Sequence, residues 1–143
     1  MELGNDLIGI IEYELAIFKR RTLFPRTIDM KNSKSRAGYL LLRYLDDYGP
    51  TAIKTLADTS HLDISTVSRQ TADLEAKGFV QRFTDPRDGR VCFLQITPAG
   101  QLCLDEIKQA RFVKVSKLLK NWSVEECQKF GELMGRLNRT FID

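Results

Sequence analysis

A cluster of polar side chains suited to hydrogen bonding with DNA bases lies in one short segment of the 143-residue chain. The cluster comprises Ser65, Thr66, Ser68, Arg69 and Gln70. A helix that meets base edges in the major groove needs small polar and long hydrogen-bonding side chains at its N-terminal end. Arg69 is able to bind guanine through two hydrogen bonds, and Gln70 is able to bind adenine in the same way. These residues therefore predict a base-reading surface, and the alternative is an ordinary solvent-exposed polar helix.

A second candidate set follows in a segment of turn residues, Pro86–Gly89. Arg87 and Arg90 stand on either side of Asp88. Arginine at the tip of a hairpin is able to enter the minor groove, where negative potential is concentrated. We expect Asp85 and Asp88 to hold the arginines and the turn in place through charge-assisted hydrogen bonds.

The charge of these two sets does not explain attraction to phosphate by itself. The net charge of the chain is +3, but five basic and five acidic residues balance between Asp63 and Arg90. Attraction to a phosphate backbone must therefore come partly from elsewhere, and Lys34, Arg36 and Lys54 are the candidates.

The first set requires a helix, and the sequence has the signals for one. Asp63 is a suitable N-cap for a helix over Ile64–Lys77, and Gly78 stands where a C-cap glycine is expected. Its inward face is expected to hold three residues: Val67, Leu74, and either Ala72 or Thr71. All five residues of the polar cluster are expected to point mostly outward.

Helices and strands are expected around this helix. A helix over Ala37–Tyr48, capped by Asn32-Ser33, should bury Leu40, Leu41, Tyr44, Leu45 and Tyr48. Thr51 is expected to cap a short helix through Ile53, Leu56 and Ala57. Phe79–Asp85 and Val91–Ile96 are expected to pair as a hairpin. Two helices and a hairpin in this order predict a winged helix-turn-helix over residues 34–97.

The two ends of the chain are expected to be helical and apolar on one side. Residues 3–18 have apolar side chains at helical spacing. A helix with so many apolar side chains is not expected to be stable alone in water, so it must pack on another surface, such as a second chain. Thr97-Pro98 starts a helix that runs to about Lys120, and Ser123 with Glu126 forms a capping box before the last helix. The last helix has apolar residues Phe130, Leu133, Met134, Leu137 and Phe141.

Composition argues against several classes of protein. The chain is 43% apolar and 29% charged, as in soluble globular proteins, and has no apolar run long enough to span a bilayer. Its first residues lack the basic region of a signal peptide, so a cytoplasmic location is expected. Three scattered cysteines and one histidine favour neither disulfides nor a zinc site. No catalytic set and no glycine-rich phosphate loop is present, so neither an enzyme nor a cofactor is expected.

The segment Leu56–Gly100, LADTSHLDISTVSRQTADLEAKGFVQRFTDPRDGRVCFLQITPAG, resembles the core of the MarR family of transcriptional regulators. The matching pieces are LA, STVSR, LEAKGFV, DPRDGR and ITPAG. Two positions depart from the family's pattern: His61 stands where glycine is usual, and Ser60 where an apolar residue is common. The resemblance implies a mainly α fold with a small β-hairpin wing.

The resemblance also implies a homodimer in which the end helices, residues 1–33 and 98–143, interleave, while residues 34–97 bind DNA. Double-stranded DNA at a pseudo-palindromic operator is then the expected partner, and no membrane is involved. Ser65, Thr66, Ser68 and Arg69 match the family's major-groove positions, and Arg87, Asp88 and Arg90 match its wing.

Many members of the family bind small aromatic acids or lipophilic compounds between the two parts of the molecule. Phe18, Arg21, Phe24, Tyr39 and Arg43 are candidates for such an effector pocket. The sequence thus favours a repressor released by a small ligand. The remaining alternative is a winged-helix module that binds proteins instead of DNA. A redox role for Cys92, Cys103 or Cys127 stays open.

Overall fold

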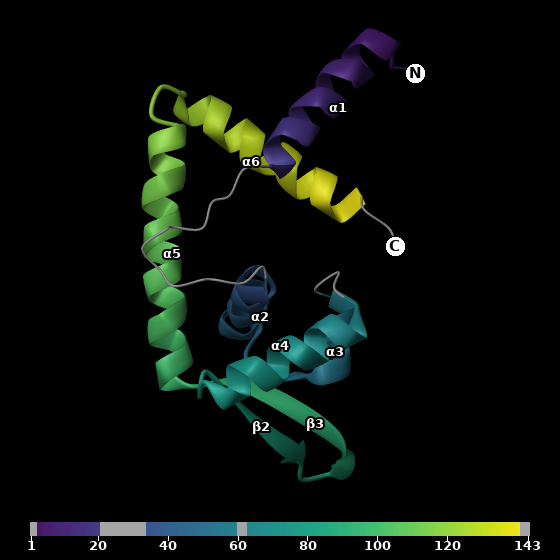
Figure 1. Cartoon of the computed structure of the whole chain (residues 1–143), viewed down its shortest axis with the longest axis vertical. Coiled ribbons are helices and arrows are strands. Elements are labelled where there is room, and N and C mark those ends of the chain that lie inside the picture. Colours follow the sequence, from purple (N-terminus) through teal and green to yellow (C-terminus); the bar gives the residue numbers. More distant parts are fainter. Residues whose placement is uncertain (1–2, 21–33, 60–62, 141–143) are drawn as a thin grey trace.

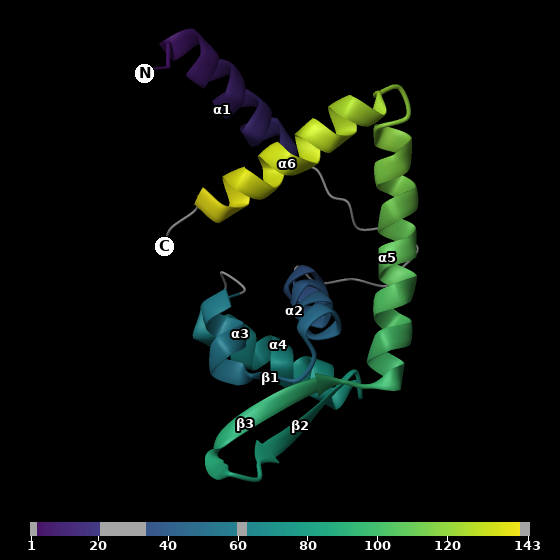
Figure 2. The same ribbon diagram turned by 180° about the vertical axis from the view of Figure 1, so that it is seen from behind.

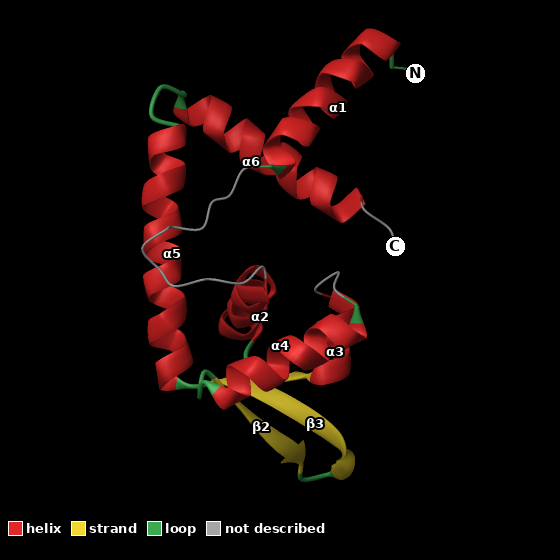
Figure 3. Cartoon of the chain, viewed as in Figure 1, coloured by secondary structure: helices red, strands yellow, loops and turns green. Residues whose placement is uncertain are grey.

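The structure is a computed structural model of the chain, and it describes residues 3–20, 34–59 and 63–140. The described chain is mostly helical with one small sheet, as the sequence predicts (Figure 3). The elements in chain order are α1 (Asn5–Lys19), α2 (Lys34–Tyr48), β1 (Thr51–Ala52), α3 (Ile53–Thr59), α4 (Ile64–Ala76), β2 (Val80–Asp85), β3 (Asp88–Ile96), α5 (Pro98–Leu118) and α6 (Val124–Thr140).

Helices α2, α3 and α4 pack with the sheet and the start of α5 into one lobe with a common core. The side chains in that core are at most 6% exposed: Tyr39, Leu41, Leu42, Leu45, Leu56, Val67, Leu74, Val80, Leu94, Leu104 and Ile107. Helix α5 leads away from this lobe to α6, which crosses α1 at the far end of the molecule (Figures 1 and 2). Neither α1 nor α6 has a buried residue within the described chain.

The sheet has three antiparallel strands in the order β1-β3-β2, one more than the sequence predicts. The additional strand is β1, in which Thr51 pairs with Leu94 and Ala52 with Phe93. The expectation that Thr51 caps α3 is wrong, because its hydroxyl donates instead to the carbonyl of Gly49 at 2.8 Å. A strand of two residues has no periodicity to detect, so only its pairing with β3 reveals it.

The predicted buried face of α2 is partly wrong. Leu40 is 51% exposed and Tyr48 is 71% exposed, whereas Leu42 is 2% exposed. Helix α2 packs against both α4 and α5, so its buried stripe is centred on adjacent residues Leu41 and Leu42. Its first residue is Lys34, three before the expected start, and the proposed cap Asn32-Ser33 lies outside the described residues.

The junction of α4, the sheet and α5 is closely fitted. The Thr97 hydroxyl caps α5 by accepting from the Gly100 amide at 3.0 Å, and it donates to the Gly78 carbonyl at 2.6 Å. The Thr97 amide donates to the Phe79 carbonyl at 3.1 Å. A Cβ atom at Gly100 would overlap that same carbonyl, so glycine is required for this close approach. The start of α5 is therefore fixed to the turn that ends α4.

Candidate nucleic-acid interface

Helix α4 begins at Ile64, as the sequence predicts, and ends at Ala76, one residue before the predicted end. The Asp63 carboxylate caps it by accepting a hydrogen bond from the Thr66 amide at 2.6 Å. Bonds from the Ser65 hydroxyl and the Thr66 amide lower the pKa of Asp63 to about 2, so this carboxylate is ionised at neutral pH. Gly78 has a φ of +78° just after the helix, where glycine has no steric penalty.

The outer face of α4 carries most of the predicted base-reading set. Ser65, Ser68 and Arg69 are exposed, and Thr66 is half-buried at the edge. Ser65 and Arg69 each stand two residues from the buried Val67, about 200° round the helix in opposite directions. They therefore lie close together on the side of α4 that faces away from the core.

Gln70 does not belong to this outer face, and that part of the prediction is wrong. Its side chain is 4% exposed. It stands three residues after Val67, only about 60° from it round the helix, so it points into the lobe. Gly38 of α2 lies opposite, where a Cβ atom would be 3.6 Å from Gln70 Oε1, an ordinary van der Waals contact. Of the two residues that the sequence offered for the inner face, Thr71 is the buried one, at 1% exposed, and Ala72 is exposed.

The tip of the β2–β3 hairpin has the predicted arrangement of acids and arginines. Pro86-Arg87 forms the turn between Asp85 and Asp88. The Asp85 carboxylate accepts from the Arg87 amide at 2.8 Å, and Asp88 accepts from the amide and Nε of Arg90 at 3.0 and 3.2 Å. The bonds from Arg90, first from its amide and then from its side chain, lower the pKa of Asp88. Both arginine side chains remain exposed.

An ion pair that the sequence did not indicate joins this hairpin to α4. Arg82 Nε lies 3.3 Å from Glu75 Oε2. In the β2–β3 register Arg82 pairs with the buried Leu94, so it lies on the sheet face that α4 covers. Strand alternation would have placed Arg82 on the inner face, but its partner on another element could not be read from the sequence.

The predicted contacts to the phosphate backbone are only partly described. Lys54 is exposed on α3. Lys34 and Arg36 lie in the first turns of α2, but their side chains are outside the described part of the structure, as are His61 and Ser60 of the turn before α4.

Two of the predicted effector-pocket residues line one groove between α2 and α5. The groove has a volume of about 450 Å³ and is lined by Tyr39, Arg43, Arg111, Phe112, Val115 and Ser116. Arg43 Nη1 donates to the Tyr39 hydroxyl at 3.1 Å, and the Arg111 guanidinium lies 4.7 Å from the Tyr39 ring centre. Phe18 does not line the groove, and Arg21 and Phe24 lie outside the described residues. Sequence reasoning missed Arg111, since only packing brings α5 beside α2.

Other kinds of site find little support in the described residues. The described residues contain no helix that is long and apolar enough to cross a membrane, and no cluster of metal-ligating side chains. Cys92, Cys103 and Cys127 are free thiols, and burial raises the pKa of Cys103, which makes it less reactive.

A model of the MarR family matches residues 34–92, from α2 into β3. YxaD of Bacillus subtilis (strain 168), an uncharacterized HTH-type transcriptional regulator, is 45% identical over 141 residues, which cover 98% of this chain and 99% of YxaD. The chain belongs to the MarR family. It is thus a transcriptional regulator with a DNA-binding winged helix.

Solved structures of other regulators have the same fold. MarR from E. coli, complexed with operator DNA, has a TM-score of 0.71 and 20% identity, over 96% of this chain and 99% of that one. BpsR of Bordetella bronchiseptica, whose DNA binding is regulated by 6-hydroxynicotinic acid, has a TM-score of 0.65 and 21% identity, over 94% and 97% of the two chains.

Proposed function

We propose that the protein is a homodimeric repressor that binds a pseudo-palindromic operator and releases it when a small aromatic acid binds. The observation that carries the DNA-binding part is the joint surface of α4 and the wing. The exposed Ser65, Ser68 and Arg69 lie on a helix that an ion pair, Glu75 with Arg82, ties to the arginine-tipped hairpin. In this proposal α4 enters the major groove, and Arg87 and Arg90 reach the adjacent minor groove.

Further residues are assigned to the phosphate backbone. Lys54, with Lys34 and Arg36 at the start of α2, supplies positive charge that the recognition helix and the wing lack, because acids balance the bases there. Asp88 has a supporting role in the wing, since it accepts both hydrogen bonds from Arg90 and leaves the terminal guanidinium nitrogens free for DNA. Gln70 is buried, so we assign it no base contact.

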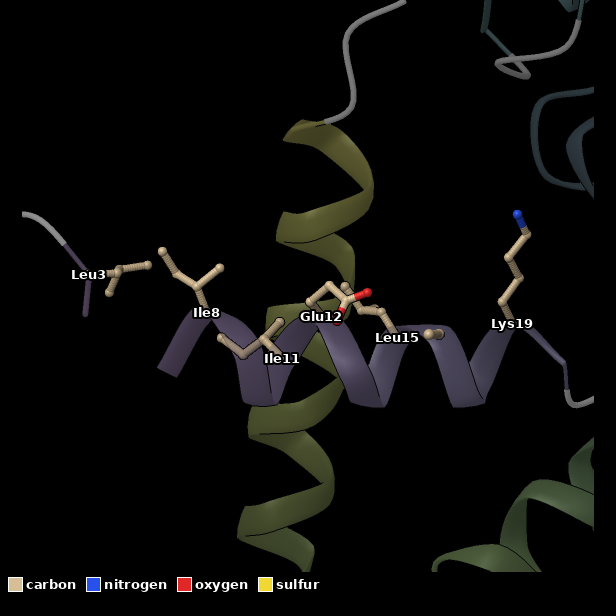
Figure 4. Close-up of a pocket in the computed structure, with 7 residues that line it drawn as sticks. Leu3, Ile8, Ile11, Glu12, Leu15 and Lys19 are labelled. Carbon is tan, nitrogen blue, oxygen red and sulfur yellow. The ribbon is translucent and has the colours of Figure 1, made fainter. Parts of the chain in front are cut away.

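The homodimer is supported by the apolar surface at the far end of the molecule. Residues along one side of α1 form an open groove of about 500 Å³, lined by Leu3, Ile8, Ile11, Glu12, Leu15, Ala16 and Lys19 (Figure 4). On α6, Phe130 is 42% and Leu133 is 47% exposed. Apolar side chains in such number are unfavourable in water, and a second copy of the chain would bury them. We therefore assign residues 1–33 and 98–143 to dimerisation and residues 34–97 to DNA binding.

The release step is supported by the chemistry of the α2–α5 groove. Arg43 and Arg111 supply two positive charges, and Tyr39 and Phe112 supply aromatic surface. A guanidinium binds a carboxylate through paired hydrogen bonds, and aromatic rings stack on flat ligands. The groove lies between α2, a helix of the DNA-binding lobe, and α5. Helix α5 runs from this lobe to α6 (Figure 2), so a ligand in the groove would bias the position of the lobe relative to the end helices. BpsR responds to an aromatic acid of this class.

A winged-helix module that binds proteins instead of DNA is the competing function. Selection of genomic fragments by the purified protein at about 150 mM salt, followed by sequencing, separates the two, because non-specific phosphate contact is weak at that salt concentration. The proposal predicts enrichment of an inverted repeat with half-sites about one helical turn apart. Absence of any enriched fragment, for protein freed of ligands by refolding, would support the protein-binding module.

A further inference from the structure

The first turn of α4 has a hydrogen-bond arrangement that restricts what Ser65 is able to recognise. The Ser65 hydroxyl lies 2.6 Å from Oδ1 of Asp63, and the Thr66 amide lies 2.6 Å from the same oxygen. An ionised carboxylate only accepts hydrogen bonds, so the single hydroxyl proton of Ser65 points toward Asp63. Asp63 is ionised throughout the physiological range, since its pKa is lowered to about 2.

A serine hydroxyl has one proton and two lone pairs. With its proton committed to Asp63, Ser65 presents only lone pairs to a ligand, although its side chain is exposed. The oxygens of DNA phosphates are acceptors, so Ser65 in this state is unable to bind them. In the major groove the hydrogen-bond donors are the amino groups of adenine and cytosine.

We propose that Ser65, held by Asp63, is a specificity-determining acceptor that selects a base amino group, on adenine or cytosine, in each half-site of the operator. This inference rests on the proposed DNA-binding function of α4. Arg69 lies on the same face one turn further on and has only donors, so it suits the acceptor edge of guanine. The two residues thus favour opposite kinds of base edge at neighbouring positions.

Ser68 differs from Ser65 in a way that provides a matched control. It is also an exposed serine of α4, yet its side-chain hydroxyl makes no hydrogen bond within the described residues. Its hydroxyl is free to rotate, so it is able to donate or accept. Ser68→Ala therefore removes a hydroxyl of the same helix without removing the acceptor that Asp63 holds in place.

The experiment uses the full-length protein and the operator obtained by genomic selection. Single amino groups are deleted from the operator by replacing adenine with purine, or cytosine with 2-pyrimidinone, one position at a time. For the wild type, one such deletion in each half-site is expected to weaken binding by about three- to tenfold. The same deletion is expected to change binding of Ser65→Ala less than twofold, whereas Ser68→Ala remains as sensitive as the wild type.

Two substitutions of Asp63 test the role of the carboxylate. Asp63→Asn keeps an acceptor oxygen for both Ser65 and the Thr66 amide, so sensitivity to the amino deletion is retained. Asp63→Gly remains a tolerated N-cap but has no acceptor, so Ser65 is free to donate and the sensitivity falls. Thermal unfolding of each variant shows that the helix is intact.

The outcomes distinguish this inference from the proposed function. An enriched operator whose binding responds to no single amino deletion overturns the inference alone. Equal responses of the wild type and Ser65→Ala also overturn it. If no operator is enriched, the proposed function and the inference fall together.

Discussion

Arg90 donates two hydrogen bonds to a single oxygen of Asp88, from its backbone amide at 3.0 Å and from Nε at 3.2 Å. The carboxylate thereby fixes both the backbone of the wing tip and the start of the guanidinium. The Arg90 side chain is nevertheless 92% exposed, so its remaining nitrogens face solvent. A carboxylate next to DNA is unfavourable because both are negatively charged. Asp88, however, positions the basic side chain of Arg90.

The wing arginines are expected to be needed for DNA binding but not for folding. The double variant Arg87→Ala, Arg90→Ala should bind the operator roughly tenfold or more weakly, since it loses two positive charges next to the DNA. Fluorescence anisotropy measures the affinity, and sedimentation checks that the dimer is intact. Lys117→Ala, Lys120→Ala removes the same charge from exposed positions, one near the end of α5 and one in the turn that follows it, so it serves as the control. Equal losses in both double variants would contradict the assignment of the wing.

Gly100 is expected to be intolerant of alanine. The added Cβ would overlap the Phe79 carbonyl and lie 2.9 Å from Ile96 Cγ1, so α5 would have to shift away from α4. We expect a loss of about 1–3 kcal/mol in the free energy of unfolding, measured by denaturant titration. Gly131→Ala is the control, because its Cβ meets nothing within 4 Å in this protomer and alanine favours a helix such as α6. A Gly100→Ala protein as stable as the wild type would mean that the junction is looser than described.

The cap of α4 is expected to make stability depend on pH in the acid range. The pKa of Asp63 is about 2 in the folded protein, below the roughly 3.9 of an unfolded aspartate. Its ionised form therefore stabilises the fold fully above about pH 4, and this contribution disappears as the pH falls through about 2. Asp63→Asn keeps the cap but does not titrate. The difference in Tm between the wild type and this variant should be largest near neutral pH and shrink toward pH 2; a difference that does not change with pH would count against the described hydrogen bonds.

The α2–α5 groove is expected to control release from the operator. Benzoic, hydroxybenzoic and 6-hydroxynicotinic acids are suitable probes, and at least one of them should weaken operator binding by the wild type. Arg111→Ala should reduce that response about tenfold or more, because a guanidinium that binds the carboxylate is lost. Lys117→Ala, on the same helix but outside the groove, should respond like the wild type. If no acid affects binding, the proposed release step is wrong.

The features predicted correctly from the sequence are those that depend on neighbouring residues. The caps at Asp63, Thr97 and Ser123 are local hydrogen bonds within four residues, so the sequence carries the whole signal. The same holds for the acid–arginine pairs of the wing, which are two residues apart.

The features that the sequence did not reveal depend on contacts between distant elements. Gln70 is polar, but the packing of α2 against α4 buries it. Strand β1 exists because β3 pairs with it, and Arg111 joins the groove because α5 packs beside α2. For each of these, residue type and spacing were compatible with an exposed or irregular position, and only tertiary packing decided otherwise.

In the proposed repressor, two copies of the chain bind one inverted repeat. The most direct test is a titration of the enriched operator with the protein by analytical ultracentrifugation, alongside the same duplex with one half-site scrambled. We expect two chains per intact operator and a loss of affinity of at least tenfold for the scrambled duplex. One chain per operator, or equal affinity for both duplexes, would contradict binding of the operator by a dimer.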